Sequence, residues 1–210
     1  MINIKDIARF YQDSFFHQVL QKELSDCKSV LDVGCGDNSP LGKIHKNFYS
    51  EGIDIFKRNI IRSRERKIHD NYKRDDINKL SKLYKKKSFD AVVSLDVIEH
   101  LKKSEAIRLI SQMENIAKKK VMILTPNGFF VQDAVNGNKY QEHKSGWSVE
   151  ELNDLGYRVY GLRGLKFLRG ERANIKYKPY LFWGLCSFLS EIVFYYFPAL
   201  SFDLFAVKKL

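Results

Sequence analysis

The sequence predicts an α/β fold in which one mostly parallel β-sheet is covered by helices on both faces. Two observations predict it. Short apolar segments rich in branched aliphatic residues alternate with segments of helical periodicity, which is the pattern of a parallel sheet with crossover helices. The 210 residues, 44% of them hydrophobic, are enough for one sizeable core but few for two, so we expect a single domain.

Four segments have the composition of buried strands. They are Ser29 to Val33, which ends at glycines, and "GIDIF" at 52–56, "FDAVVSL" at 89–95 and "KVMILTP" at 120–126. Each is bounded by turn residues, as strands commonly are. The later segments "YRVYGLRGLKFL" and "SFDLFAVKK" are also strand-like, and we expect them to pair as a final antiparallel unit.

Two helices are indicated by their periodicity and by their ends. In "KKSEAIRLISQMENIAKK" an apolar stripe includes Ile107, Ile110 and Met113 at helical spacing. In "WSVEELNDLGY", Ser148 and Glu151 form a capping box, and a glycine follows the last turn. The second pattern predicts a short helix that begins after Ser148.

The segment 179–200 is almost entirely apolar and approaches the length of a membrane span. A span of about 20 residues would have to carry Glu191 near its middle and Pro198 near its end, which argues against insertion. We expect a helix packed on the domain or on a second subunit of a homodimer. Five cations between Lys166 and Lys178 precede the segment, so a helix lying in the membrane interface stays open.

Cysteine content and charge bound the setting of the protein. Three cysteines, spaced like neither a disulfide framework nor a zinc site, indicate a reducing cytoplasm, and the N-terminal segment lacks the uninterrupted apolar run of a secretory signal. The formal net charge is +11. Lysine runs at 85–87 and 118–120 are assigned to loops, where solvation accounts for most of this charge, although an anionic partner stays open.

The segment "LDVGCGDNS", Leu31 to Ser39, predicts a ligand-binding loop at the end of the first strand. Its glycines allow a tight turn and a close approach of a ligand to the backbone. A dinucleotide fingerprint would need a third glycine where Ser39 stands, and Asp32 and Asp37 would flank a pyrophosphate unfavourably. A ligand with cationic character, such as S-adenosylmethionine, fits better, and Asp54 follows the second strand where a carboxylate can accept both ribose hydroxyls.

With these residues in place, the chain resembles a class I S-adenosylmethionine-dependent methyltransferase, of the small single-domain branch related to quinone-biosynthesis methyltransferases. The motifs that carry the resemblance occur in family order between about Ser29 and Tyr160. They are "VLDVGCGDNSPL", "GIDI", "RDDI", "FDAVVSLDVIEHL" and "VMILTPNGFF". The resemblance implies a Rossmann-like seven-stranded sheet whose antiparallel last strand lies between the fifth and the sixth.

The resemblance also implies the cofactor and its site. S-adenosylmethionine would be held by the methionine-binding loop, the ribose strand, the adenine strand and the end of the fourth strand. The implied cofactor-binding residues are Asp32, Gly34, Gly36, Asp54, Ile55, Asp76, Ile77, Leu95 and Asp96. The first would lie near the ammonium group and the last two beside the methyl donor. Cys35 is interpreted as a small buried filler.

A hydroxyl acceptor requires a base, and two histidines lie beyond strand ends. His143 is our candidate general base because related enzymes place its region against the acceptor, while His100 is expected to stabilise a turn. The motif "DVIEH" spaces Asp96, Glu99 and His100 so that a helical turn could gather them, with His143 arriving from the next loop. Some methyltransferases with a similar motif bind a divalent metal; relatives also carry such residues for structure, so no metal is predicted.

The acceptor itself is predicted only by class. We expect O-methylation of a small molecule, a lipid or a lipid-linked sugar. RNA is a minority alternative because neither the motif of base methyltransferases nor an RNA-binding module is present, and a noncatalytic binding subunit is a second alternative. The expected organisation is a helical lid at 1–27, a cofactor-binding core at 28–168, an apolar helical insertion at 169–200 with peripheral membrane contact through 179–200 as one role, and the last strand at 201–210.

Overall fold

A seven-stranded sheet forms the centre of the molecule. The computed structural model describes residues 4–133, 139–170 and 174–210. The strands are β1 (Ser29–Val33), β2 (Tyr49–Asp54), β3 (Asn71–Arg74), β4 (Phe89–Leu95), β5 (Ala117–Pro126), β6 (Arg158–Leu165) and β7 (Ser201–Lys209). Their order in the sheet is β3-β2-β1-β4-β5-β7-β6. The sheet is mixed, because β7 is antiparallel to both of its neighbours while β1 to β5 pair in parallel.

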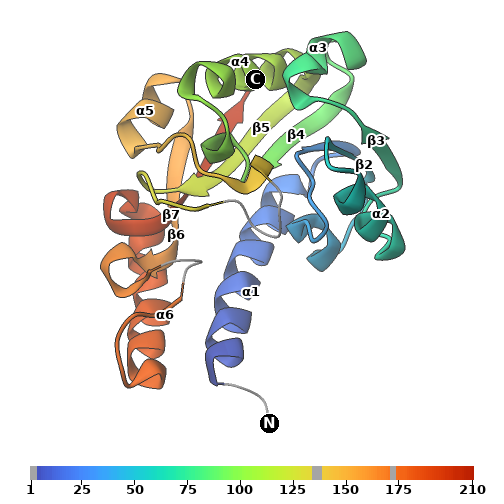
Figure 1. The fold of residues 1–210 in the computed structure, drawn as a ribbon. Coiled ribbons are helices and arrows are strands. Elements are labelled where there is room, and N and C mark those ends of the chain that lie inside the picture. Colours follow the sequence, from blue (N-terminus) through green and yellow to red (C-terminus); the bar gives the residue numbers. More distant parts are fainter. Residues whose placement is uncertain (1–3, 134–138, 171–173) are drawn as a thin grey trace.

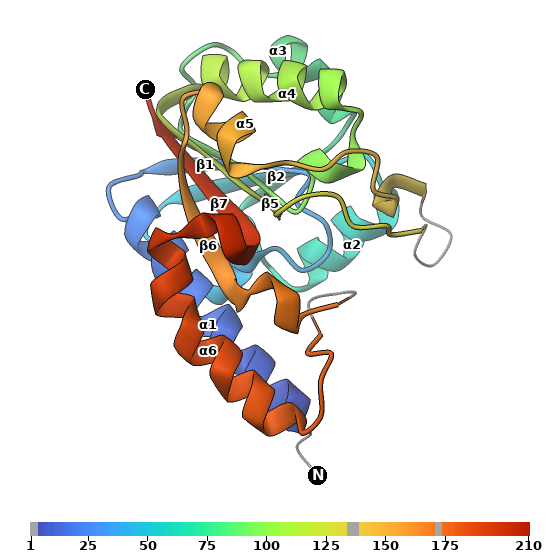
Figure 2. The same cartoon turned by 90° about the vertical axis from the view of Figure 1, so that its left-hand side faces the viewer.

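Helices cover both faces of this sheet. They are α1 (Ile4–Leu24), α2 (Lys57–Glu65), α3 (Leu80–Leu83), α4 (Lys103–Ile116), α5 (Val149–Asp154) and α6 (Tyr180–Tyr196). Figures 1 and 2 show α3, α4 and α5 on one face and α1 and α6 side by side on the other. The predicted α/β class, the Rossmann-like seven-stranded sheet and the antiparallel last strand are therefore confirmed.

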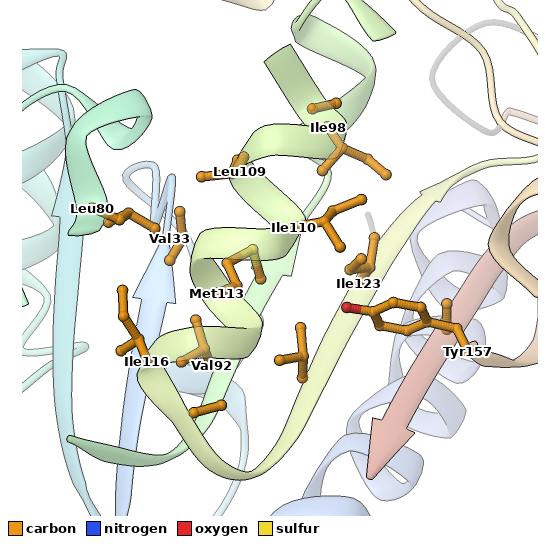
Figure 3. Packing of buried hydrophobic residues seen from close by; sticks show 14 of the residues in the cluster. Val33, Leu80, Val92, Ile98, Leu109, Ile110, Met113, Ile116, Ile123 and Tyr157 are labelled. Atoms are coloured by element: carbon orange, nitrogen blue, oxygen red, sulfur yellow. The ribbon is translucent and has the colours of Figure 1, made fainter. Parts of the chain in front are cut away.

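The larger part of the core lies between α4 and the central strands. Leu109, Ile110, Met113 and Ile116 of α4 are buried and point toward β1, β4 and β5 (Figure 3). The predicted apolar stripe was wrong at Ile107, which is 44% exposed. Leu109, two residues further along, is fully buried, because it lies on the side of the helix that faces β4 and β5.

The opposite face of the sheet is covered mainly by α1. Phe16, Leu20 and Leu24 are buried against inward residues of β4, β5 and β7. The ring of Phe16 lies edge-on to that of Phe205, with centroids 5.6 Å apart. These contacts belong to the C-terminal half of α1, and the predicted lid role of 1–27 stays a prediction, with residues 1–3 outside the described residues.

The lysine run at 118–120 was assigned to a loop, and this was wrong. It belongs to β5, and Lys120 is 6% exposed. The ammonium group of Lys120 contacts a carboxylate oxygen of Asp26 at 2.7 Å and donates to the carbonyl oxygen of Glu23 at 2.7 Å. The charge of this buried lysine is thus balanced by groups at the C-terminal end of α1 and in the turn after it. These contacts tie α1 to the first half of β5.

The capping box at Ser148 and Glu151 is confirmed. The Ser148 hydroxyl accepts from the backbone N–H of Glu151 at 3.3 Å, and the Glu151 carboxylate accepts from the Ser148 N–H at 2.9 Å. This pair of hydrogen bonds fixes the first turn of α5, the short helix that precedes β6.

The difference between Leu109 and Ile107 predicts unequal effects of the same truncation. Leu109→Ala should lower the free energy of unfolding by about 2 to 5 kcal/mol, because it opens a cavity in the core. Ile107→Ala should cost less than about 1 kcal/mol, because its side chain already contacts water. Urea unfolding of both variants measures the difference, and equal losses would contradict this packing of α4.

Candidate functional site

A cavity of about 550 Å³ lies at the carboxyl ends of β1, β2, β3 and β4. This is the edge of a parallel sheet at which α/β proteins bind their ligands. Eight of the nine cofactor-binding residues expected from the sequence line it, namely Gly34, Gly36, Asp54, Ile55, Asp76, Ile77, Leu95 and Asp96. Residues from four separate strand ends therefore meet at one cavity.

The loop after β1 requires its two glycines for different reasons. Gly34 has φ +74°, and a Cβ at this position would lie 2.6 Å from a methyl carbon of Val97. Gly36 has φ +58°, but a Cβ there would meet nothing within 4 Å. Gly34 therefore permits close packing beneath the loop, whereas Gly36 supplies the left-handed backbone of the turn that faces the cavity.

Asp54 joins this loop to the end of β2. Its Oδ2 accepts from the backbone N–H of Gly36 at 3.0 Å and from the side-chain amide of Asn59 at 3.1 Å. Its Oδ1 accepts from the N–H of Phe56 at 2.7 Å. Burial raises the pKa of Asp54, and the three donors oppose that rise. The carboxylate is thus held rigidly with its edge in the cavity wall.

Asp32 lies behind the loop and is not among the described residues that line the cavity. It is 1% exposed. Its Oδ2 accepts from the Ser39 hydroxyl at 2.5 Å and lies 3.3 Å from Nε2 of the buried His69. The residue expected beside the ammonium group of the cofactor therefore contacts two protein groups instead, and its visible role is to fix the path of residues 34 to 39.

The ends of β3 and β4 complete the cavity wall. Asp76 caps the short helix Ile77–Lys79 by accepting from the N–H of Asn78 at 3.0 Å. Asp96 follows β4 with φ +56°, an uncommon conformation for a residue that carries a Cβ. That strain lies at the position where the wall passes from Leu95 to His100, and strained backbone of this kind is concentrated at functional sites.

Cations line the cavity as well, and the sequence argument missed them. Arg58 and Arg62 of α2 are lining residues, and Arg62 contacts the Asp37 carboxylate at 3.2 Å. The carboxylate of Asp37 is therefore partly neutralised. The helical spacing of Arg58 and Arg62 directly after the ribose strand was the available signal, because it places both on one face of the helix that follows Asp54.

Glu99, His100 and His143 come together beside the cavity. Each offers one ligand atom, and these atoms lie within 4.8 Å of one another. His100 lines the cavity, and its ring centroid lies 4.8 Å from that of His143, which is not among the described lining residues. The Glu99 carboxylate accepts from the Thr125 hydroxyl at 3.0 Å. The loop between β5 and α5 thus brings His143 to the turn after β4.

Burial shifts the pKa of both histidines in the direction that favours the neutral form. Burial, followed by the nearby His143, lowers the pKa of His100 to about 4, and burial also lowers the pKa of His143. The backbone carbonyl of Phe130 lies 2.8 Å from Nδ1 of His143, which assigns the proton to Nδ1 and the lone pair to Nε2. Burial, with the carboxylates of Asp96 and Asp203, raises the pKa of Glu99 well above its usual range.

The comparisons with known proteins decide the family. A family model described as a methyltransferase domain matches residues 5–166, which is most of the chain. The chain belongs to this methyltransferase family. S-adenosylmethionine is accordingly the methyl donor, and the expected cofactor and enzyme class are confirmed. No curated protein matches the chain.

Solved structures of methyltransferases share this fold. An S-adenosylmethionine-dependent methyltransferase from Archaeoglobus fulgidus has 21% sequence identity and a TM-score of 0.59, with 94% of each chain covered. The magnesium protoporphyrin IX methyltransferase of Synechocystis PCC 6803, solved with bound S-adenosylmethionine, has 16% identity and a TM-score of 0.54, covering 99% of this chain and 85% of that one. At these identities the likeness concerns the fold alone.

The lowered pKa of His100 predicts a pH dependence of the methyltransferase's stability. Below the ordinary histidine pKa of 6.5 the unfolded chain binds a proton that the folded imidazole does not bind until about pH 4. The free energy of unfolding should therefore fall as the pH decreases from about 7 to about 5. His100→Asn should remove part of this fall, and urea unfolding of both proteins at both pH values measures it. An identical pH dependence in the two proteins would contradict the lowered pKa.

Proposed function

We propose that this methyltransferase transfers the methyl group of S-adenosylmethionine to a hydroxyl of a small-molecule, lipid or lipid-linked sugar acceptor. The observation that carries the proposal is the meeting of His100, His143 and Glu99 beside the cavity end formed by Leu95 and Asp96. A neutral imidazole at that position suits removal of a proton from a hydroxyl. The resemblance to the branch related to quinone-biosynthesis methyltransferases supports a quinone-like or other lipid acceptor.

The cofactor is proposed to lie across the strand ends in family order. Gly34 and Gly36 would contact the methionine part, and Asp54 would accept from the ribose hydroxyls. Asp76 and Ile77 would hold the adenine, with Ile55 beside the ribose strand. Asp32 would act through the loop, because its contacts to Ser39 and His69 turn it away from the cavity. This arrangement is supported by the fact that the residues proposed to contact the cofactor directly all line one cavity.

His143 is proposed to be the general base. S-adenosylmethionine, when bound, would supply an activated methyl carbon, to which the acceptor oxygen would bond as the carbon–sulfur bond breaks and leaves its electron pair on sulfur. Nε2 of His143 takes the hydroxyl proton, since Nδ1 already donates to Phe130. The lowered pKa of His143 keeps Nε2 unprotonated at neutral pH. The remaining contribution of the protein is alignment in a confined site.

Removal of the Asp54 carboxylate should weaken cofactor binding. Asp54→Ala should lower the affinity for S-adenosylmethionine by at least about tenfold, because it removes a charged acceptor for ribose hydroxyls and frees the glycine loop. Calorimetric titration with S-adenosylmethionine and with S-adenosylhomocysteine measures the loss.

Asp70→Ala is the matched control for this titration. The Asp70 carboxylate also accepts from a backbone N–H at a strand end, that of Ser50 at 2.8 Å, but it lies at the other end of β2, away from the cavity. Its replacement should leave the affinity unchanged. Equal affinities of the Asp54 variant and the unaltered protein would contradict the proposed ribose contact, and failure of the unaltered protein to bind would favour a noncatalytic subunit.

Replacement of His143 should separate catalysis from binding. His143→Ala should lower kcat on a hydroxyl acceptor by about a hundredfold or more and leave the affinity for S-adenosylmethionine unchanged. The acceptor is to be identified first by a screen that includes lipid-linked glycans and quinone-like phenols, with a single-stranded RNA as the test of the minority alternative. Unchanged turnover of the variant on an identified hydroxyl acceptor would remove His143 from the mechanism.

The cluster of Glu99, His100 and His143 also suits a second mechanism, which removal of metal ions can distinguish from the first. One carboxylate and two imidazoles with ligand atoms within 4.8 Å form a donor set that could hold a divalent metal, although the Glu99 carboxylate already accepts from Thr125. With His143 as a base, turnover should survive dialysis against EDTA. Loss of turnover that returns on adding Mn²⁺ or Mg²⁺ would assign these residues to a metal site instead.

A further inference from the structure

The helix α6 has its polar and apolar faces reversed. The residues that it buries are Gly184, Ser187 and Glu191, which are small or polar. Most of its large apolar side chains point outward instead. Those more than a third exposed, together with the two after the helix end, are Leu181, Phe182, Leu185, Phe188, Leu189, Ile192, Val193, Tyr196, Phe197 and Leu200. We call this set the outer face of α6.

The buried side of α6 is explained by its contacts with β6. A Cβ on Gly161 would lie 2.1 Å from the backbone oxygen of Phe194, and one on Gly164 would lie 2.2 Å from that of Ser187. The two backbones therefore touch, which only small residues permit. The Glu191 carboxylate accepts from the N–H of Arg163 at 2.9 Å. Polar groups on the inner side are thus used by the fold, whereas the side chains of the outer face remain largely exposed to water.

The outer face is a continuous stripe rather than scattered residues. Leu185, Leu189, Ile192 and Tyr196 follow one another at intervals of three or four, so they share one side of the helix. Leu189 is 60% exposed, Ile192 63% and Tyr196 67%. A contiguous apolar patch of this extent on a monomer marks a contact with another apolar phase.

The charges around the stripe favour an anionic lipid surface as that phase. Lys176 and Lys178 are exposed at the N-terminal end of α6. Between residues 174 and 200 the single carboxylate is Glu191, which is 2% exposed and engaged by the fold. A symmetric dimer would place this same surface against itself and offer the lysines no carboxylate from within it. Lipid headgroups with negative charge would complement the charge of both lysines.

The aromatic residues of the segment suit the boundary between headgroups and acyl chains. Tyr177 precedes the helix and its ring lies 5.8 Å from that of Trp183, while Tyr196 ends the helix. Tyrosine and tryptophan have this distribution where one end of a side chain is apolar and the other is wet. Among the described residues no helix is both long enough and apolar enough to cross a membrane, so α6 would lie in the plane of the interface.

We propose that the outer face of α6 docks the protein on an anionic membrane surface, with Lys176 and Lys178 on headgroups and the stripe in the acyl boundary. The proposal does not depend on the methyl acceptor. It is tested by binding to vesicles, which involves no methyl transfer. Vesicle binding can therefore fail while S-adenosylmethionine binds in calorimetry, and S-adenosylmethionine binding can fail while the protein still binds vesicles.

The test is co-sedimentation with vesicles of phosphatidylcholine alone and with vesicles that contain about one third phosphatidylglycerol. The unaltered protein should bind the anionic vesicles. The double variant Leu189→Glu with Ile192→Glu should lose at least about tenfold in partitioning, because it places two carboxylates in the apolar stripe. Its matched control is Ile61→Glu with Ile107→Glu, at apolar positions 46% and 44% exposed on other helices, which should bind as the unaltered protein does.

A charge variant and a fluorescence measurement complete the test. Lys176→Glu with Lys178→Glu should abolish the preference for anionic vesicles, whereas Lys85→Glu with Lys86→Glu, at exposed lysines elsewhere, should retain it. Trp147 is buried, so a blue shift on adding vesicles reports Trp183 in the unaltered protein. Absence of both sedimentation and blue shift would overturn the proposal. Sedimentation velocity that shows a dimer abolished by the α6 variant, without vesicle binding, would assign the face to a second copy.

Discussion

The cavity depends on the carboxylate of Asp54, which joins two strand ends that the chain forms separately. It accepts hydrogen bonds from the N–H of Gly36 in the loop after β1, the N–H of Phe56 in the turn after β2 and the side-chain amide of Asn59 in α2. A parallel sheet brings those ends to one edge but does not fix the loops between them. The three hydrogen bonds do so, and they also orient the carboxylate before a ligand arrives. Binding then needs little further ordering, which is the physical advantage of a preorganised site.

Burial determines the charge states around this edge. The Glu99 carboxyl lies among other carboxylates with its pKa raised, and two imidazoles beside it have their pKa values lowered. All three groups are therefore shifted toward their neutral forms. No protonated imidazole would then oppose the approach of a positively charged methyl donor, which suits the proposed methyl transfer.

The place of the last strand was implied by the family resemblance, and most of the cavity wall followed from residues at the strand ends. Glycines at 34 and 36 and carboxylates at 54 and 76 stand at strand ends, and a parallel sheet must gather them. The inward turn of Asp32 could not be predicted, since it depends on His69 from a distant segment. The arrival of His143 beside His100 was anticipated only as one arrangement of the "DVIEH" motif, and the exposure of Ile107 next to the correctly placed Ile110 was not anticipated, because both depend on contacts with distant segments. Local periodicity carries no information on such contacts.

The segment after α6 and the proposed base, His143, both contact residues that follow the end of β5. Asn127, just after β5, donates through its side chain to the carbonyl oxygens of Pro198, Ala199 and Ser201, which connect α6 to β7. Three residues later the ring of Phe130 lies 5.0 Å from that of Phe202, and the Phe130 carbonyl accepts from His143. A change in the position of α6 would therefore reach His143 through one short chain of contacts. Docking of the outer face and alignment of the base would share these contacts, so a membrane that steadies α6 would steady the acceptor side of the cavity as well.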